Sequence, residues 1–462
     1  MTSHKTHNPY TEKDLHEYRH LTTKEIDKEI QLTHQSFVNW KQESIDSRCK
    51  SLIELKQCLE KHKQRCATII SSEMGKPISD AILEVEKCMW LCQHYAENAQ
   101  QYLADKVIDA DYLQSFVTYQ PLGIIFAIMP WNFPFWQVLR FAIPTLTAGN
   151  ACLLKHASLS TGAGNLIQEL FEEAGYMPHL FKNMIIDTTQ CEYIIANEFV
   201  KGVTLTGSEQ AGQSVASQAG KHLKKVVLEL GGSDPYILLS DADLACAAEQ
   251  IVKSRLNNAG QVCIAAKRVM VQPHQHSKLI NLITSLSKKY KMGDPLSPDT
   301  TLGPLASKSL QVNLHNQVKE SLAHGATLHF GGEIPNRQGY FYPPTLLDNV
   351  SPGMPAFDEE LFGPVISIIP VKDDDQAIKL ANQSQFGLGA AVFSQDINRA
   401  KTIAKTLVNA GCCFVNQLVS SDPRLPFGGI NRSGYGRELS EEGIQEFCNI
   451  KTVVISKTGL PE

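Results

Sequence analysis

The stretch Asn257-Asn258-Ala259-Gly260-Gln261-Val262-Cys263 decides how the rest of the sequence is interpreted. A helical pattern over residues 244–256 runs into it, and a strand pattern over residues 268–272 follows. Gly260 allows a sharp turn between the two, so we expect Cys263 on a loop that is held at both ends. A thiol in that position is placed for nucleophilic attack.

A second stretch lies upstream, Val226-Val227-Leu228-Glu229-Leu230-Gly231-Gly232. Its β-branched run is typical of a buried strand that ends in a carboxylate beside two glycines. A carboxylate at such a strand end can take a proton from a thiol or from water. Alone, Glu229 also fits a solvated strand end, and any one of the 12 cysteines is more often a buried filler than a nucleophile. Together, the two stretches favour a cysteine nucleophile served by a carboxylate base.

The same residues carry a resemblance to a known family. Glu229-Leu230-Gly231-Gly232 and Gly260-Gln261-Val262-Cys263 resemble the general-base and nucleophile motifs of the aldehyde dehydrogenase superfamily. The resemblance spans residues 8–456 and implies an α/β, aldehyde dehydrogenase-like fold: two doubly wound α/β domains plus a small β oligomerisation segment. Four further signatures occur in family order: Pro130-Trp131-Asn132-Phe133-Pro134, Thr206-Gly207-Ser208, Glu360-Leu361-Phe362-Gly363-Pro364-Val365 and Pro426-Phe427-Gly428-Gly429.

Length and composition agree with a globular enzyme. A chain of 462 residues exceeds what one hydrophobic core usually supports, so we expect two large domains. Hydrophobic residues at 43% and charged residues at 20% are ordinary values. A formal net charge of −5 gives no electrostatic reason to expect nucleic acid as a partner.

We expect a cytoplasmic protein with no membrane span and no metal site. Residues 1–28 are polar and contain five acidic residues, unlike a signal peptide. The most apolar stretch, residues 121–136, is shorter than the ~20 residues of a membrane helix. The cysteines include no C-x-x-C pair, which argues for reduced thiols without a zinc site or a disulfide framework.

The order of patterns along the chain predicts its domains. Amphipathic helices from Thr22 or Thr23 to about residue 101 are interpreted as a packing layer without evident chemistry. Five short apolar strands (124–129, 151–154, 184–186, 203–205 and 226–228) alternate with helices, which argues for a parallel doubly wound sheet. A second α/β unit starts at Pro235, and glycine and proline are dense over residues 331–364. We therefore assign residues 1–105 and 121–232 to a nucleotide-cofactor domain and residues 233–430 to a catalytic domain.

Two further segments are assigned to oligomerisation, residues 106–120 and 440–456. Residues 112–120 alternate polar and apolar side chains, as a half-exposed strand does. The resemblance implies that this strand, together with one over residues 449–456, pairs between subunits of a homo-oligomer, a dimer or a tetramer. An exposed strand edge also needs a partner on physical grounds.

The resemblance implies the chemistry of each catalytic residue. Cys263 is expected to attack the aldehyde, Glu229 to activate the thiol or a water, and the Asn132 side chain with the Cys263 N–H to hold the oxyanion. Taken alone, Asn132 would be a turn residue before Phe133-Pro134.

NAD or NADP is the implied cofactor, although the usual Gly-x-Gly-x-x-Gly fingerprint is absent. Thr206-Gly207-Ser208 lies instead where a strand turns into a helix, a place that suits a phosphate but is more often a simple cap. Many family members carry a glutamate that repels a 2′-phosphate, where this chain has Ser158, so NADP should be tolerated beside NAD. The cofactor contacts implied by the resemblance are Trp131, Lys155, Ser158, Gly207, Ser208, Leu230, Glu360 and Phe362.

Arg140 points to the substrate. It lies eight residues after Asn132, which we expect to be a little over two helical turns, or ~12 Å. Succinate semialdehyde dehydrogenases carry an arginine here for the distal carboxylate, and the chain resembles their short bacterial members. Ser420 or Ser421 would supply a hydroxyl to the same carboxylate. One departure is Asn257, where some members carry a second arginine.

Three alternatives remain open at this level. The first is an aldehyde dehydrogenase for another short aldehyde. The second is a cofactor-independent cysteine hydrolase, for which the nearest histidines in sequence are His222 and His274. The third is a noncatalytic protein on the same scaffold, against which the presence of Cys263, Glu229 and Asn132 argues.

Overall fold

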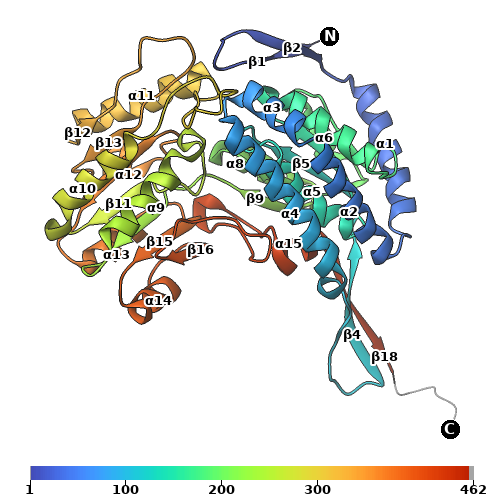
Figure 1. Ribbon diagram of the computed structural model, residues 1–462. Helices are drawn as coiled ribbons and strands as arrows, with labels where there is room; N and C mark the ends of the chain where they lie inside the picture. The colour runs from blue at the N-terminus through green and yellow to red at the C-terminus, as the bar shows by residue number, and fades with distance from the viewer. Residues whose placement is uncertain (1, 457–462) are drawn as a thin grey trace.

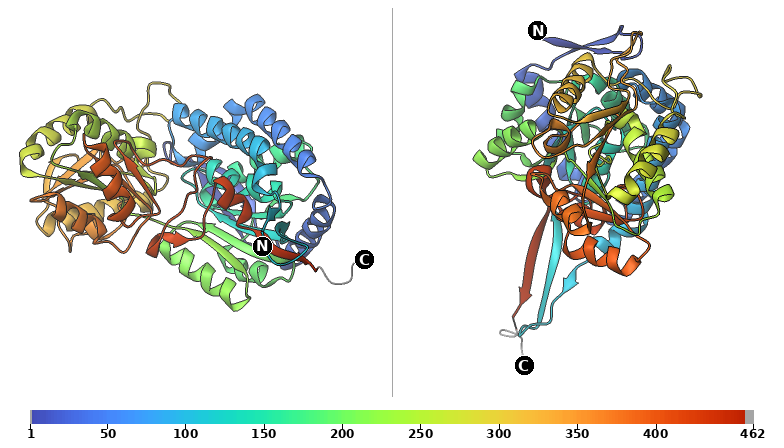
Figure 2. Two further views of the ribbon diagram at one scale, coloured as in Figure 1. Left: turned by 90° about the horizontal axis from the view of Figure 1, so that it is seen from below. Right: turned by 90° about the vertical axis from the view of Figure 1, so that its left-hand side faces the viewer.

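The computed structural model describes residues 2–456 and divides into two α/β lobes, with a β arm that extends below the lobe carrying helices α1 to α5 (Figure 1). Each lobe is built on its own sheet, with helices packed against it, and Figure 2 shows the lobes side by side. The predicted fold class, two α/β domains plus a small β segment, is confirmed.

The first lobe holds a six-stranded sheet in the order β17-β9-β8-β5-β6-β7, in which only the short β17 runs antiparallel. Its central strand β5 is apolar throughout and almost wholly buried, as expected of a parallel strand covered on both faces. The predicted strand at residues 184–186 is wrong by three positions, because β7 ends at Asn183. The strands are β5 Ile124–Met129, β6 Ala151–His156, β7 Phe181–Asn183, β8 Val200–Thr206, β9 Lys225–Glu229 and β17 Gly434–Tyr435.

Helices of this lobe surround that sheet. Helix α1 begins at the predicted place, because Thr22 and Glu25 form a reciprocal capping box at its start. Helices α5 and α8 pack against the sheet, while α2, α3 and α4 form the outer layer seen in Figure 1. The helices are α1 Thr23–Trp40, α2 Ile45–Lys61, α3 Lys63–Met74, α4 Ile78–Tyr102, α5 Trp136–Thr147, α6 Thr161–Glu173, α7 Cys191–Ala196, α8 Glu209–Lys221 and α15 Ser440–Gln445.

The second lobe holds a seven-stranded sheet in the order β12-β13-β14-β11-β10-β15-β16, in which only β12 runs antiparallel. Strand β13 is fully buried and lies in the segment rich in glycine and proline, where no strand was predicted. The elements are β10 Pro235–Leu238, α9 Leu244–Leu256, β11 Arg268–Val271, α10 Pro273–Ser287, α11 Lys308–Ala323, β12 Thr327–Phe330, β13 Thr345–Asp348, α12 Pro355–Asp358, β14 Val365–Pro370, α13 Asp374–Asn382, β15 Gly389–Phe393, α14 Ile397–Thr406 and β16 Cys412–Val415.

Two small sheets complete the described chain. An N-terminal hairpin pairs β1 (Ser3–His7) with β2 (Asp14–Arg19) and was not predicted. The arm pairs β4 (Gln114–Pro121) with β18 (Cys448–Ile455) and with β3 (Lys106–Val107), so β18 lies at a free edge. Figures 1 and 2 show the arm projecting beyond both lobes. The two segments that were expected to pair between subunits pair with each other within one chain, and their pairing with another subunit stays a prediction.

Three features bear on location and metal content. No helix within residues 2–456 has the length and apolar character needed to cross a bilayer. All 12 cysteines are free thiols. The described residues contain no cluster of three or more histidine, cysteine or acidic side chains suited to a metal ion.

Candidate active site

The loop that carries Cys263 has an unusual backbone. After α9, the 3-10 turn over Asn257–Gly260 places Asn258, Ala259 and Gly260 in the left-handed region, at φ values of 51°, 52° and 73°. Two non-glycine residues in that region are costly, so the surroundings must hold them there. A Cβ on Gly260 would lie 2.2 Å from the carbonyl oxygen of Gly363, so only glycine fits.

Hydrogen bonds fix this loop at both ends, as predicted. Asn258 Nδ2 donates to the carbonyl oxygen of Asn132 at 2.8 Å, which ties the loop to the first lobe. At the other end, Lys267 Nζ donates to the carbonyl oxygen of Cys263 at 2.5 Å. Cys263 therefore lies on a loop that is hydrogen-bonded to both lobes.

Asn132 lies in the turn between β5 and α5, beside the Cys263 loop. Its Nδ2 donates to the carbonyl oxygen of Gln261 at 3.0 Å, which uses one of the two amide protons. The second proton remains available for an oxyanion at Cys263. The expected eight-residue helix from Asn132 to Arg140 is wrong, because α5 begins only at Trp136. The residue before Pro134 is disfavoured in helical geometry, so the turn persists.

The Cys263 side chain is half-buried, and burial sets its protonation state. Removal from water raises the pKa of the thiol to about 12, against the opposing positive charges of Lys267 and Arg140. The resting group at neutral pH is thus a thiol and not a thiolate. It needs a base or an approaching ligand before it can attack.

Glu229 ends strand β9 and is 2% exposed. Burial, followed by the nearby Glu438 carboxyl, raises its pKa well above the usual value. Within the described chain, neither of its carboxyl oxygens has a hydrogen-bond partner. Gly428 lies against it, since a Cβ there would be 2.8 Å from Glu229 Oε1. Such a carboxyl is a strong base once it is ionised, and it is free to receive a proton.

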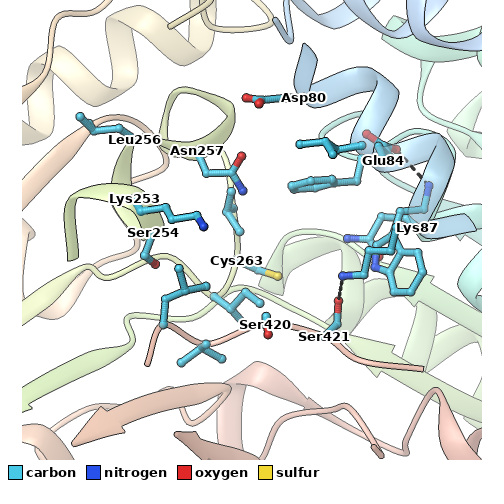
Figure 3. A pocket seen from close by; sticks show the side chains of 18 of the residues that line it. Asp80, Glu84, Lys87, Lys253, Ser254, Leu256, Asn257, Cys263, Ser420 and Ser421 are labelled. Atoms are coloured by element: carbon cyan, nitrogen blue, oxygen red, sulfur yellow. Dashed lines mark hydrogen bonds between the residues drawn. The ribbon is translucent and has the colours of Figure 1, made fainter. Parts of the chain in front are cut away.

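A cavity of about 590 Å³ opens in front of Cys263 (Figure 3). Its walls come from α4, α5, the Cys263 loop and residues 418–421. Ser420 and Ser421, the residues predicted to bind the substrate carboxylate, both line this cavity. Asn257, which stands where some family members carry an arginine, lines it too. No histidine is among the described residues that line it, which disfavours a cysteine–histidine hydrolase using His222 or His274.

Arg140 lines the cavity and is 2% exposed, so it is not a surface cation. Its guanidinium forms an ion pair with Glu438 and lies 4.9 Å from the ring centre of Phe427. Glu438 was not found from the sequence, because it comes from a segment far from Arg140 with no motif of its own. Arg140 is therefore a buried cation whose charge is already partnered.

Helix α4 also contributes to the cavity, so its interpretation as a mere packing layer was wrong. Asp80, Leu83, Glu84 and Lys87 line the wall at the spacing of one helix face. Lys87 Nζ donates to Ser421 Oγ at 2.7 Å and lies 4.1 Å from the ring centre of Trp136. The sequence signal for Lys87 is its place on the apolar face of a predicted helix, because lysine is seldom buried in proteins unless it has a partner.

On the other side of the Cys263 loop lie the residues predicted to contact the nicotinamide half of a cofactor. Trp131 and Phe362 meet edge to face with ring centres 5.8 Å apart. Glu360 accepts a hydrogen bond from the Gly232 N–H at 3.1 Å and pairs with Lys267 at 3.1 Å. Glu360 is thus held beside the same lysine that anchors the Cys263 backbone.

The residues predicted for the rest of the cofactor lie at strand ends of the first lobe. Ser208 caps α8 by accepting from the Ala211 N–H, and a Cβ added at Gly207 would meet only Leu205, at an ordinary contact distance of 3.6 Å. Leu230 packs against Gly212, where a Cβ would approach to 2.7 Å. An uncrowded helix N-terminus of this kind suits a phosphate group.

Lys155 and Ser158 complete this side of the sheet. Lys155 ends β6 and is 5% exposed, and it forms no ion pair with any described residue. Ser158 is exposed at the start of a 3-10 turn that leads into α6. A buried lysine without a counterion and an exposed hydroxyl fit the ribose and 2′-phosphate of NADP as well as the ribose of NAD.

Comparison with known proteins identifies the family. The profile of the Aldehyde dehydrogenase family matches residues 2–453. The chain belongs to the aldehyde dehydrogenase family. This agrees with the resemblance of its motifs, and with the proximity of Cys263, Asn132 and Gln261 in the structure.

Similar aldehyde dehydrogenases come from several bacteria. A protein of Synechocystis sp. named probable succinate-semialdehyde dehydrogenase (NADP+) is 42% identical over 98% of this chain and 99% of its own length. One of Escherichia coli K12, named succinate semialdehyde dehydrogenase (NAD(P)+), is 43% identical over 96% of each. The crystal structure of succinic semialdehyde dehydrogenase from Streptococcus pyogenes with NADP+ is 37% identical, with a TM-score of 0.96 over 98% of this chain and 100% of that one.

The buried thiol predicts a steep pH dependence. Because the pKa of Cys263 is raised to about 12, its thiolate fraction grows about tenfold per pH unit below that value. Alkylation of Cys263 by iodoacetamide in the cofactor-free protein should therefore accelerate about tenfold per unit between pH 7 and pH 9. Mass spectrometry of quenched samples measures the rate at this residue. A plateau by pH 7 would contradict the neutral resting thiol.

The matched variant is Cys263→Ala, which removes the reactive atom with little change in volume. It should abolish aldehyde oxidation while the protein remains folded, as judged by its melting temperature. If oxidation survived in Cys263→Ala and disappeared on replacing another cysteine, the assignment of the nucleophile would be wrong.

Proposed function

We propose that this aldehyde dehydrogenase oxidises succinate semialdehyde, or a closely similar short carboxylated aldehyde, to the acid with NAD+ or NADP+. The observation that carries the proposal is the cavity itself. Its lining includes Cys263 together with buried cationic and hydroxyl groups, among them Arg140 and Ser421. A carboxylate must leave water to enter such a cavity, which is costly unless cations and hydrogen-bond donors receive it.

The reaction begins at Cys263. Glu229, once ionised, takes the thiol proton, and the sulfur adds to the aldehyde carbonyl to give a thiohemiacetal. The oxyanion is held by the free Asn132 amide proton and the Cys263 backbone N–H. These two donors are preorganised, because Asn132 and the Cys263 loop are already hydrogen-bonded to each other's backbone.

The bound nicotinamide supplies the hydride acceptor, so loss of hydride from the thiohemiacetal leaves a thioester on Cys263. Trp131, Leu230, Glu360 and Phe362 would hold the nicotinamide half, while Lys155, Ser158, Gly207 and Ser208 would hold the adenosine and phosphates. Glu229 passes the proton that it took from the thiol to solvent, and then removes a proton from the water that attacks the thioester. The acid is released with Cys263 as the thiolate, and Glu229 returns the proton to the sulfur, so it acts in both halves of the cycle.

The substrate proposal predicts a preference for the charged aldehyde. Succinate semialdehyde should have a kcat/KM at least about 30-fold higher than butanal, because the distal carboxylate pairs with buried cations that butanal leaves unused. Steady-state assays with each cofactor measure the ratio. Equal values for the two aldehydes would leave the family intact and remove this substrate.

Ser158 predicts how the cofactors are discriminated. Ser158→Glu should weaken NADP+ by about tenfold or more while NAD+ changes by less than threefold, because a carboxylate beside the 2′-phosphate repels it. Titration calorimetry on the aldehyde-free enzyme measures both constants. Ser158→Ala is the control for loss of the hydroxyl alone. An equal loss of both cofactors would mean that Ser158 does not lie at the ribose.

The arm supports a homo-oligomer as part of the same proposal. Strand β18 has a free edge, and Ile450 and Val454, two of its residues that project to one side, are 60% and 46% exposed. An open strand edge with apolar side chains is a pairing surface, and two-fold pairing is the commonest closed solution. The 12 unpaired cysteines fit a cytoplasmic location for the assembly.

Light scattering at micromolar concentration should therefore give a mass of two or four chains of 51.1 kDa. Ile450→Lys should shift the population toward the monomer, because it places a charge in the paired surface. Ile397→Lys is the matched control, since Ile397 is 55% exposed on α14 of the other lobe. A monomeric wild-type protein would contradict the proposal.

A further inference from the structure

Arg140 alone does not account for the positive charge in this cavity. It contacts Glu438 through Nε, and Glu438 is a carboxyl that is itself 5% exposed. The Glu438 carboxyl offsets part of the Arg140 charge. A second source of positive charge would therefore strengthen the binding of an anion here.

Lys87 is that source. It forms no ion pair with any described residue, although several acids surround it. Glu84, one turn away on α4, pairs with Lys76 and accepts the N–H groups of Phe135 and Trp136. Asp422, on the loop after Ser421, pairs with Arg424 at 2.7 Å. Both acids thus have other partners, and Lys87 forms no ion pair of its own.

Two contacts fix the position of the Lys87 side chain. Its ammonium donates to Ser421 Oγ at 2.7 Å and lies 4.1 Å from the Trp136 ring centre, so two contacts hold it at the cavity wall. In Figure 3 the Cys263 sulfur is turned toward the Lys87–Ser421 pair. Asp80, the other acid of this helix face, lies two turns before Lys87, ~10 Å along the axis.

In the enzyme without substrate, burial and a neighbouring positive charge disfavour the charged form of Lys87. Burial, together with the neighbouring charge of Arg140, lowers the pKa of Lys87 to about 8. An anion beside it would relieve both effects, because it restores a counterion and replaces lost hydration. Butanal offers no such relief, whereas a four-carbon semialdehyde carries its carboxylate at the end opposite the reacting carbon.

We propose that Lys87, with the Ser421 hydroxyl, binds the distal carboxylate of the substrate beside Arg140. This inference rests on the proposed function, since it names the residue that makes the preference for a carboxylated aldehyde. Ser421 has room for this role, because its oxygen accepts from Lys87 and its own proton is left to donate to the substrate.

The test compares selectivity and not activity alone. Lys87→Met keeps the length and apolar stem of the side chain and removes the charge. It should lower kcat/KM for succinate semialdehyde by at least about 30-fold, mainly through KM, and lower that for butanal by less than threefold. Lys87→Arg should restore at least a third of the wild-type preference, which a merely structural role would not predict.

A second readout avoids turnover. Calorimetric binding of succinate to the cofactor-free protein should weaken at least tenfold in Lys87→Met, while NADP+ binding stays within twofold. Lys253→Met is the control, because Lys253 lines the same cavity but is exposed, and its loss should change succinate binding by less than threefold.

The outcomes separate the two proposals. If the wild type shows no preference for succinate semialdehyde over butanal, the proposed function fails. If the wild type shows the preference and Lys87→Met keeps it with succinate binding unchanged, the function stands and the role of Lys87 is overturned. If Lys87→Met lowers both aldehydes alike and weakens NADP+ as well, the residue is structural and the inference is also overturned.

Discussion

The left-handed run Asn258-Ala259-Gly260 is the constraint on which the rest of the site depends. Holding a non-glycine residue in that conformation costs about 1–3 kcal/mol of folding free energy, so the run persists only because contacts with its surroundings stabilise it. The Asn258 amide bonded to the Asn132 carbonyl, and the Gly363 backbone packed against Gly260, are those surroundings. Because Asn132 belongs to the first lobe and Gly363 to the second, the Cys263 loop holds this conformation only when both lobes are folded.

The resting site is neutral where the chemistry occurs and cationic where the substrate must be recognised. Burial favours the protonated forms of the Cys263 thiol and the Glu229 carboxyl, since a low-dielectric surrounding penalises their charged forms. The pairs Arg140–Glu438 and Lys76–Glu84 place an acid beside two of the buried cations nearby, whereas Lys87 has no ion-pair partner among the described residues. An enzyme arranged in this way holds a weakly reactive thiol until a base removes its proton. That protects Cys263 from alkylation and oxidation between turnovers.

How much of this was predictable depends on whether the signal is local. Strand β5 was predicted at both ends, because six apolar residues bounded by Gly123 and Pro130 leave little choice. The Cys263 loop was predicted from Gly260 and its flanking patterns. Strand β13 was missed, because glycine and proline around Thr345–Asp348 hide four buried residues. Glu438 and Lys87 were missed for another reason. Each acquires its role only from a partner brought near by the fold, and no spacing along the chain records such a contact.

The C-terminal residues pack onto the first lobe, and this affects how the protein folds during synthesis. Strand β4 receives its long partner from β18, β9 receives β17, and Arg140 receives Glu438, so the first lobe is completed by residues 434–455. During synthesis, the second lobe is translated in full before these pieces exist. Pairings of such high sequence separation form late and slowly. Until then, β4 and the Arg140 cation lie open on a nascent chain. The first lobe can therefore close only after translation of these last strands. A chaperone that shields an unpaired strand edge would act on this protein at that stage.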